Sequence, residues 1–129
     1  MRVIRGRDEG QPTARGSDEW FTGDVWLDPI IPAGGHEAVH CSAVTFEPGA
    51  RTRWHTHEGD QILIVLSGEG RVSDTARGTT IRAGDVVHIP AGEKHWHGAA
   101  PGTIMSHLAV TAGEAQWMEA VSEEEYGAF

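Results

Sequence analysis

The chain has 129 residues and carries 19 acidic against 10 basic side chains, which gives a formal net charge of −9 at pH 7. This charge argues against binding to nucleic acid or to anionic membrane surfaces, because a row of phosphates would be repelled rather than neutralised. The length fits a single domain, residues 1–129, which can bury one core without disulfides or a structural metal.

Cysteine content and hydropathy indicate the compartment. The single cysteine, Cys41, cannot form an internal disulfide, which is typical of a protein from a reducing cytoplasm. The first seven residues carry charge with no apolar run behind them, so we expect no signal peptide. The longest apolar run, Ile62 to Leu66, is far too short to cross a bilayer. We therefore expect a cytoplasmic protein that does not associate with membranes.

Short strand-like segments recur along the chain after a polar stretch at residues 8–19. In chain order, the sequence predicts strands at 25–31, 39–46, 51–57, 61–66, 71–73, 79–82, 86–89, 94–98 and 103–111. A turn is expected at residues 67–70, and Ser122 with Glu125 forms a capping box for a short C-terminal helix. Many short strands at near-regular spacing, with 17 glycines for the turns, predict an all-β antiparallel sandwich or barrel.

Two His-x-His pairs are the strongest signal of chemistry. Residues i and i+2 of a strand point to the same face, so His55 and His57 project together, as do His95 and His97. Neutral imidazole is a common ligand of first-row transition metals. The turn at residues 58–60 brings Gln61 beside the first pair, and one member of the second pair completes a four-ligand site while the other lines the cavity. Exposed histidines on polar strands are the alternative interpretation, but four of the 8 histidines fall into these pairs. His36, His40 and His88 have no evident partner and are interpreted as ordinary polar positions.

The ligands lie within two glycine-anchored motifs that resemble those of the cupin superfamily. The first motif is Gly49, His55-Thr56-His57, Gln61 and Gly68, and the second is Gly84, Pro90-Ala91-Gly92, His95 and Ala99. The resemblance implies a jelly-roll β-barrel in which His55, His57, Gln61 and His95 hold the metal. It also implies one cupin domain, with an N-terminal arm and first strand at residues 1–23, a barrel at 24–118 and a C-terminal tail at 119–129.

Two positions depart from the cupin pattern, because Gln61 replaces the usual Glu and Ala99 the usual Asn. With Gln61, all four expected ligands are neutral, and a bound dication keeps its full +2 charge. That charge favours Lewis acidity and lowers the pKa of a bound hydroxyl group, whereas it disfavours the activation of dioxygen by iron. The ligand set alone does not choose among manganese, iron, cobalt, nickel and zinc.

Further segments resemble the small bacterial manganese-dependent cupin hydroxynitrile lyases. They are Trp20-Phe-Thr-Gly, Val44-Thr-Phe-Glu-Pro-Gly-Ala-Arg-Thr, Gly92-Glu-Lys-His-Trp-His-Gly-Ala-Ala, His107-Leu-Ala and Trp117-Met-Glu. The resemblance implies manganese as the cofactor and a pocket containing His107 and Thr52, with Ser42 in the place of a small residue. Thr111 stands where that family has Gln.

The function expected from this resemblance is a lyase that cleaves or forms cyanohydrins, in which His107 with His97 accepts the hydroxyl proton as cyanide leaves. A dioxygenase-type oxidoreductase is one alternative, and a module that binds a metal or small ligand without turnover is another. The expected partner is a small-molecule substrate, and because cupins commonly dimerise we expect a homodimer or higher homo-oligomer.

Overall fold

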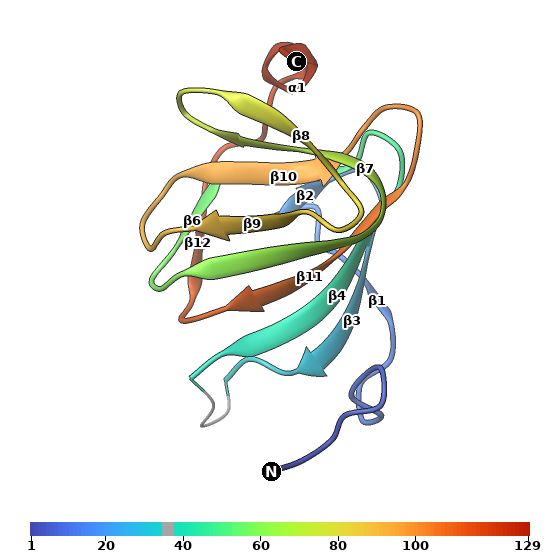
Figure 1. Ribbon diagram of the computed structural model, residues 1–129. Helices are drawn as coiled ribbons and strands as arrows, with labels where there is room; N and C mark the ends of the chain where they lie inside the picture. Colours follow the sequence, from blue (N-terminus) through green and yellow to red (C-terminus); the bar gives the residue numbers. More distant parts are fainter. Residues whose placement is uncertain (35–37) are drawn as a thin grey trace.

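The computed structural model describes residues 1–34 and 38–129 and shows a curled antiparallel β-sheet with one short C-terminal helix (Figure 1). The all-β jelly-roll prediction is therefore confirmed. The elements in chain order are β1 Ala14–Arg15, β2 Phe21–Thr22, β3 Val25–Ile31, β4 His40–Phe46, β5 Arg51–Thr52, β6 His55–His57, β7 Gln61–Asp74, β8 Gly78–Arg82, β9 Val86–Ile89, β10 His95–Ala99, β11 Met105–Thr111, β12 Ala115–Trp117 and α1 Glu123–Gly127. The main path of the sheet runs β1-β3-β4-β11-β7-β10-β5-β2.

Most predicted strands match the structure, and the exceptions have local causes. Strands β3 and β9 coincide with their predictions, whereas β1, β2 and β12 were missed because each is only two or three residues long. The predicted strand at 51–57 is divided into β5 and β6. The division arises because the amide of Arg53 donates to Trp20 O and that of Trp54 to Glu119 O.

The turn predicted at residues 67–70 is wrong, since β7 continues through it. The first half of β7 pairs with β11 and β9, and the second half pairs with β8 and β10. The strand changes partners near Gly68, which has a φ of 77°. A Cβ at this position would lie 1.8 Å from Ile104 O, so only glycine fits the bend. One long strand therefore joins the two halves of the sheet (Figure 1).

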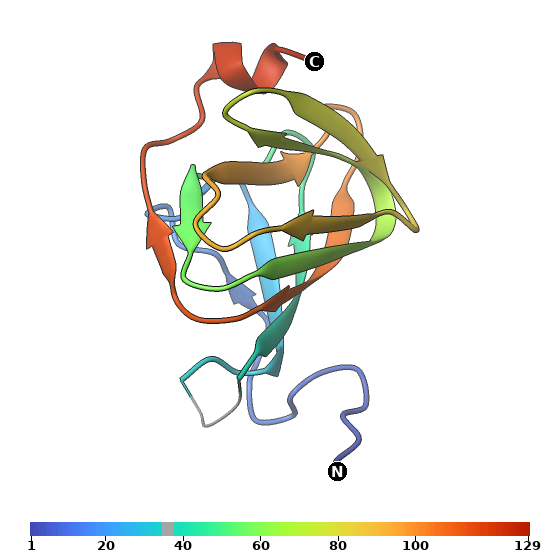
Figure 2. The ribbon, with the colours of Figure 1, turned by 60° about the vertical axis from the view of Figure 1, so that its left-hand side comes forward.

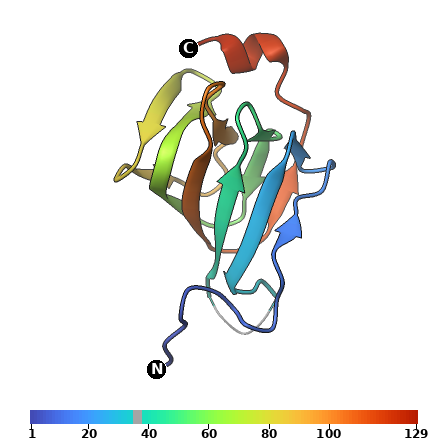
Figure 3. The same ribbon diagram turned by 90° about the vertical axis from the view of Figure 1, so that its right-hand side faces the viewer.

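The interior of the barrel is apolar at one end and polar at the other. At the apolar end Phe46 of β4 pairs with Met105 of β11, and at the polar end His40 pairs with Thr111 on the same two strands. The buried residues of the apolar end form one cluster: Phe21, Val25, Val44, Phe46, Ala50, Val65, Ile81, Ala99 and Met105. Figure 3 shows β3 and β4 closing one side of the barrel, with the N-terminus and α1 at opposite ends of the molecule. This division leaves the polar end free for a functional site.

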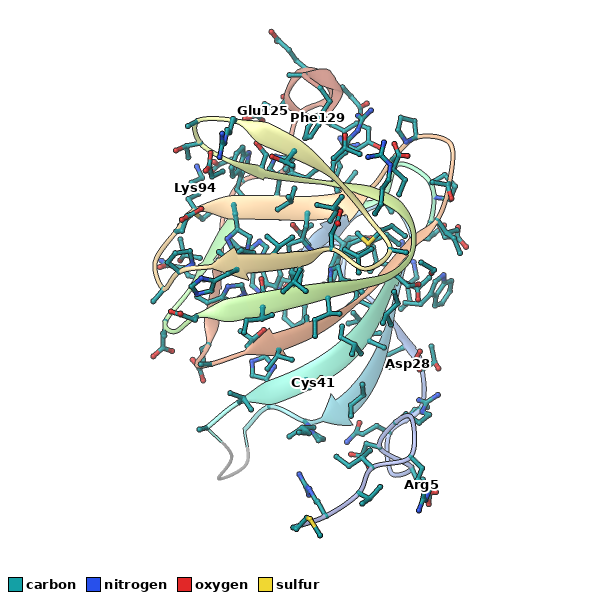
Figure 4. The ribbon with its side chains drawn as sticks, in the orientation of Figure 1. Arg5, Asp28, Cys41, Lys94, Glu125 and Phe129 are labelled. Atoms are coloured by element: carbon teal, nitrogen blue, oxygen red, sulfur yellow. The ribbon has the colours of Figure 1, made fainter. Side chains whose placement is uncertain are left out.

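Outside the barrel, the C-terminal helix α1 covers a second cluster. Trp54, which precedes His55, and Trp96, which lies between His95 and His97, pack with Val121 and Tyr126 rather than with the polar interior. The predicted capping box is confirmed, because the Ser122 hydroxyl accepts from the Glu125 amide at 3.0 Å and the Ser122 amide donates to the Glu125 carboxylate at 3.0 Å. Figure 4 shows Glu125 and Phe129 at this end of the molecule. Among the described residues, no helix has the length and apolar character needed to cross a membrane.

We expect Tyr126→Ala to lower the free energy of unfolding by about 3 kcal/mol, as for other large buried aromatic side chains. Tyr126 is buried, donates to Ala99 O and lies between the guanidinium groups of Arg51 and Arg71 at 4.4 and 4.7 Å from its ring centre. Urea denaturation measures the loss. Glu124→Ala, on an exposed position of the same helix, is the control and should stay within about 0.5 kcal/mol. A loss below about 1 kcal/mol for the tyrosine variant would contradict the role of this contact.

His36, His40 and His88 were predicted to be polar positions without an evident partner. The described part of the chain shows contacts for two of them, His40 and His88. The Nε2–H of His88 on β9 donates to Asp60 Oδ2 in the β6–β7 turn at 2.8 Å, so His88 has a partner on the surface. His40 Nε2 contacts Gly113 O at 3.2 Å. His36 lies outside the described residues. The homo-oligomer and the domain bounds expected from the sequence stay predictions.

Candidate metal centre

The four predicted ligands come together at the polar end of the barrel. His55 and His57 project from β6, Gln61 opens β7, and His95 on β10 is the register partner of His55. All four side chains are buried. The ring centre of His55 lies 4.2 Å from that of His95 and 4.9 Å from that of His57. The spacing of the two motifs in the sequence therefore corresponds to a real cluster in space.

Backbone carbonyls fix the protonation pattern of two of these histidines. The Nδ1–H of His55 donates to Arg53 O at 2.8 Å, and the Nδ1–H of His95 donates to Glu93 O at 2.8 Å. A neutral imidazole that donates through Nδ1 has an unprotonated Nε2. Each of the two rings therefore presents a lone pair, and this kind of backbone contact is typical of metal-ligating histidines.

Gln61 provides the test of whether a metal fits. Its Nε2 donates to the Thr111 hydroxyl at 3.0 Å, which turns Oε1 towards His95 Nε2 at 3.2 Å. Burial lowers the pKa of His95, so that its Nε2 stays unprotonated at neutral pH. Two acceptors then face each other with no hydrogen between them, an arrangement that a cation between them would stabilise. The residues present therefore fit a divalent metal.

His97 belongs to the same cluster. Among residues 1–34 and 38–129, the one group of three or more His, Cys, Asp or Glu side chains with ligand atoms within 4.8 Å of one another is His55, His95 and His97. Two of these are predicted ligands, and the third was expected to line the cavity beside the metal. His57 lies slightly apart from this group, although its ring centre is 5.2 Å from that of His95.

His97 and His107 form a buried pair next to the ligands. His107 Nε2 lies 3.0 Å from His97 Nδ1, and Phe46 of the apolar cluster contacts both rings, with ring centres 5.8 Å from His97 and 5.3 Å from His107. Burial lowers the pKa of His107 to about 4 and that of His97 well below its usual value, so both rings are neutral at pH 7. One hydrogen is shared between the facing nitrogens. Among the described residues, the outer atoms His97 Nε2 and His107 Nδ1 have no hydrogen-bond partner.

A cavity of about 160 Å³ opens onto both groups. The predicted pocket residues Thr52, Ser42, His97 and His107 all line it, beside His55, His57 and Gln61. The Thr52 hydroxyl accepts a hydrogen bond from the His97 amide at 3.2 Å and so holds the backbone of that histidine. The prediction that these side chains share one cavity is consistent with this arrangement, but their catalytic roles stay predictions.

Sequence reasoning missed part of the cavity wall. Strand β12 runs beside β6 (Figure 2). Trp117 on β12 is the register partner of His55, and its ring centre is 4.5 Å from that of His55. Trp20 stacks on Trp117 at 5.5 Å, and His40 also lines the cavity. The signal for His40 was its i, i+2 relation to Ser42, which places both on the inner face of β4. No periodicity marked Trp117, because β12 has only three residues.

The metal-stripped protein is expected to lose stability as the pH falls from about 6.5 to about 4. In this window an unfolded chain protonates its histidines, whereas the folded protein keeps His57 and His107 neutral down to about 4. The unfolded state then binds more protons, so the free energy of unfolding falls by up to about 1.4 kcal/mol per pH unit for each such histidine. Above about pH 6.5 both states are neutral and the dependence vanishes.

Urea denaturation of the metal-stripped protein between about pH 7.5 and pH 5 measures this slope. His107→Gln removes one of the buried histidines, and its slope should be shallower than that of the unsubstituted protein. An unfolding midpoint that does not change across this range would contradict the buried neutral state of these histidines.

The chain is similar to known proteins in both sequence and fold. The cupin domain family matches residues 42–119. The (R)-mandelonitrile lyase of Granulicella tundricola is 48% identical over 121 residues, which cover 90% of this chain and 92% of that protein. An acireductone dioxygenase of Picosynechococcus is 26% identical over 104 residues, covering 70% of this chain and 58% of that protein. The crystal structure of a cupin-like protein from Thermotoga maritima superposes with a TM-score of 0.85 at 40% identity and covers 92% of this chain and 94% of that one.

Proposed function

The chain belongs to the cupin domain family, and on that premise we propose that it is a metal-dependent lyase that cleaves cyanohydrins into an aldehyde and cyanide, or forms them in reverse. The observation that carries the proposal is the position of the neutral His97–His107 pair on the same small cavity as the ligand cluster. The similarity to an (R)-mandelonitrile lyase over 90% of the chain supports the same reaction class.

In this proposal His55, His57, Gln61 and His95 hold one divalent metal, and the proposed ion is manganese. When bound, the ion supplies Lewis acidity, which lowers the pKa of a hydroxyl group that it coordinates. Because all four side chains are neutral, they leave the charge of the ion undiminished.

The chain's own residues handle the proton. His107 together with His97 accepts the hydroxyl proton of the cyanohydrin as the bond between carbon and the nitrile breaks. The electrons of the O–H bond form the carbonyl, and those of the broken C–C bond leave with cyanide, which then takes the proton from the histidine. Burial lowers the pKa of His107 to about 4, so the ring is neutral at pH 7 and has a nitrogen lone pair with which a proton can bind.

The cavity walls hold the rest of the substrate. Trp20, Phe21, Leu27 and Trp117 line the cavity beside the histidines and offer apolar surface for the side chain of an aldehyde. They also keep water from the departing cyanide. Ser42 lines the same cavity, and in this proposal its hydroxyl contacts the bound substrate.

The test is cyanide release from mandelonitrile by the protein in its metal-stripped and manganese-loaded forms, with metal content measured by elemental analysis. We expect release well above the buffer rate that requires the metal. The proposal would be overturned by a fully loaded protein that releases cyanide no faster than buffer.

A dioxygenase is the second candidate, because acireductone dioxygenase is also related in sequence. The neutral ligand set disfavours it, since an amide oxygen donates less electron density than a carboxylate to an ion that would have to activate dioxygen. An oxygen electrode separates the two candidates, because a dioxygenase consumes oxygen with its substrate and a lyase does not. A protein that binds ligand but shows neither activity would correspond to a binding module.

A further inference from the structure

We propose that His55, His95 and His97 form a second metal position that overlaps the first, a three-histidine site suited to zinc. Their ligand nitrogens lie within 4.8 Å of one another, and all three side chains are buried. The two positions share His55 and His95. They differ in the remaining ligands, which are His57 and Gln61 for the first position and His97 for the second.

The orphaned nitrogen of His97 is the observation that points to a ligand. Its Nδ1 contacts His107, whereas its Nε2 is buried with no hydrogen-bond partner among the described residues. A buried polar atom left without a partner costs free energy, and such atoms in folded proteins are commonly explained by an ion or a water. The ring of His97 lies 5.7 Å from that of His95 and nearly parallel to it, with an angle of 13°. Because His95 and His97 are residues i and i+2 of β10, their side chains lie on the same face of that strand.

The chemistry of the donors favours different ions at the two positions. Zinc binds imidazole nitrogen at roughly 2.0–2.1 Å, and its catalytic sites commonly have three protein ligands and an open fourth position. Nitrogens around such an ion are separated by roughly 3.4 Å, and the three ligand nitrogens lie within 4.8 Å of one another, so any two would approach by at most about 1.4 Å. An octahedral ion such as manganese prefers oxygen ligands and more of them, which favours the position that includes the Gln61 amide oxygen.

Occupation of the second position would change the His97–His107 pair. Ligation through Nε2 leaves the hydrogen of His97 on Nδ1, where it is donated to His107 Nε2. The facing nitrogens already share the one hydrogen of the pair, and the ion would occupy His97 Nε2, the lone pair that would otherwise take up a further proton. This consequence rests on the proposed function: the zinc-loaded protein should have no lyase activity although its metal is bound.

Two matched variants separate the positions, and the probes are Zn²⁺ and Mn²⁺ added to metal-stripped protein with a competing chelator. We expect His97→Gln to weaken zinc binding by about 100-fold or more, and manganese binding by less than about threefold. His57→Gln should do the reverse. His88→Gln, which changes an exposed histidine paired with Asp60, should alter neither affinity. Thermal unfolding of each stripped variant shows that it is folded.

A spectroscopic reading makes the test independent of activity. Co²⁺ gives intense visible absorption in four-coordinate sites and weak absorption in six-coordinate ones, so intense bands should appear with His57→Gln and be absent with His97→Gln. The proposal is overturned if His97→Gln leaves zinc affinity unchanged, or if each variant weakens both ions equally. If the separation holds but the manganese form releases no cyanide, the proposed lyase function fails and the second metal position stands.

Discussion

His95→Ala is expected to remove metal binding and to reduce cyanide release to the buffer rate. His95 is central to the cluster, because its ring lies next to His55 at 4.2 Å and its Nε2 faces Gln61 Oε1 at 3.2 Å. It also belongs to both proposed metal positions. Loss of a residue that merely orients a ligand typically costs 10–100-fold in affinity, so loss of the ligand itself should exceed that range. Elemental analysis and a Mn²⁺ titration measure the effect.

The matched control is His97→Gln, which changes the other histidine on the inner face of β10. It should keep manganese, because the first position does not use His97. Since His95→Ala also removes a donor to Glu93 O, its far-ultraviolet circular dichroism should be checked against the unsubstituted protein. A folded His95→Ala variant that still holds one equivalent of manganese would contradict the proposed ligand set.

The sequence predicted those parts of the fold that depend on short-range patterns. Alternation placed β3 and β9 correctly and identified the inner faces of the strands that carry the histidine pairs. The capping box predicted α1, because Ser122 and Glu125 bond to each other within one turn. In each case the residues that decide the structure are neighbours in the chain.

Features that depend on distant contacts could not be predicted in the same way. The bend of β7 at Gly68 exists because the carbonyl of Ile104 approaches it closely, and no local pattern reports that approach. In the sequence, Gly68 between Ser67 and Glu69 cannot be distinguished from a glycine in a turn. The pairing of β12 with β6, which brings Trp117 onto His55, likewise joins segments about sixty residues apart.

At the candidate site too, contacts between atoms of distant strands could not be predicted from the sequence. Strand parity predicted that His97 lines the cavity, and the family resemblance implied the same of His107, but their contact at 3.0 Å depends on the separate paths of β10 and β11. The hydrogen bond from Gln61 to Thr111 also crosses strands, although the two residues are register partners. Residue types and spacing therefore predicted which side chains gather at the site, whereas their hydrogen bonds required the structure.

His107→Phe is expected to lower cyanide release by about 10²–10⁴-fold while leaving manganese affinity within about threefold of the unsubstituted protein, because the loss is that of a general base. His107 is fully buried, lines the cavity and contacts His97 through its Nε2, and it is not one of the proposed ligands. Phenylalanine suits the space beside Phe46, whose ring centre is 5.3 Å away, so the variant should fold.

Comparison with His95→Ala distinguishes the loss of a metal ligand from the loss of a proton acceptor. One variant should lose the metal and activity together, whereas His107→Phe should lose activity with the metal in place. Separate measurements of kcat and KM show which step fails, since loss of a proton acceptor lowers kcat more than it raises KM. If the manganese-loaded phenylalanine variant keeps more than about a tenth of the activity, the proton is accepted elsewhere, and His107 shapes the cavity rather than taking part in the reaction.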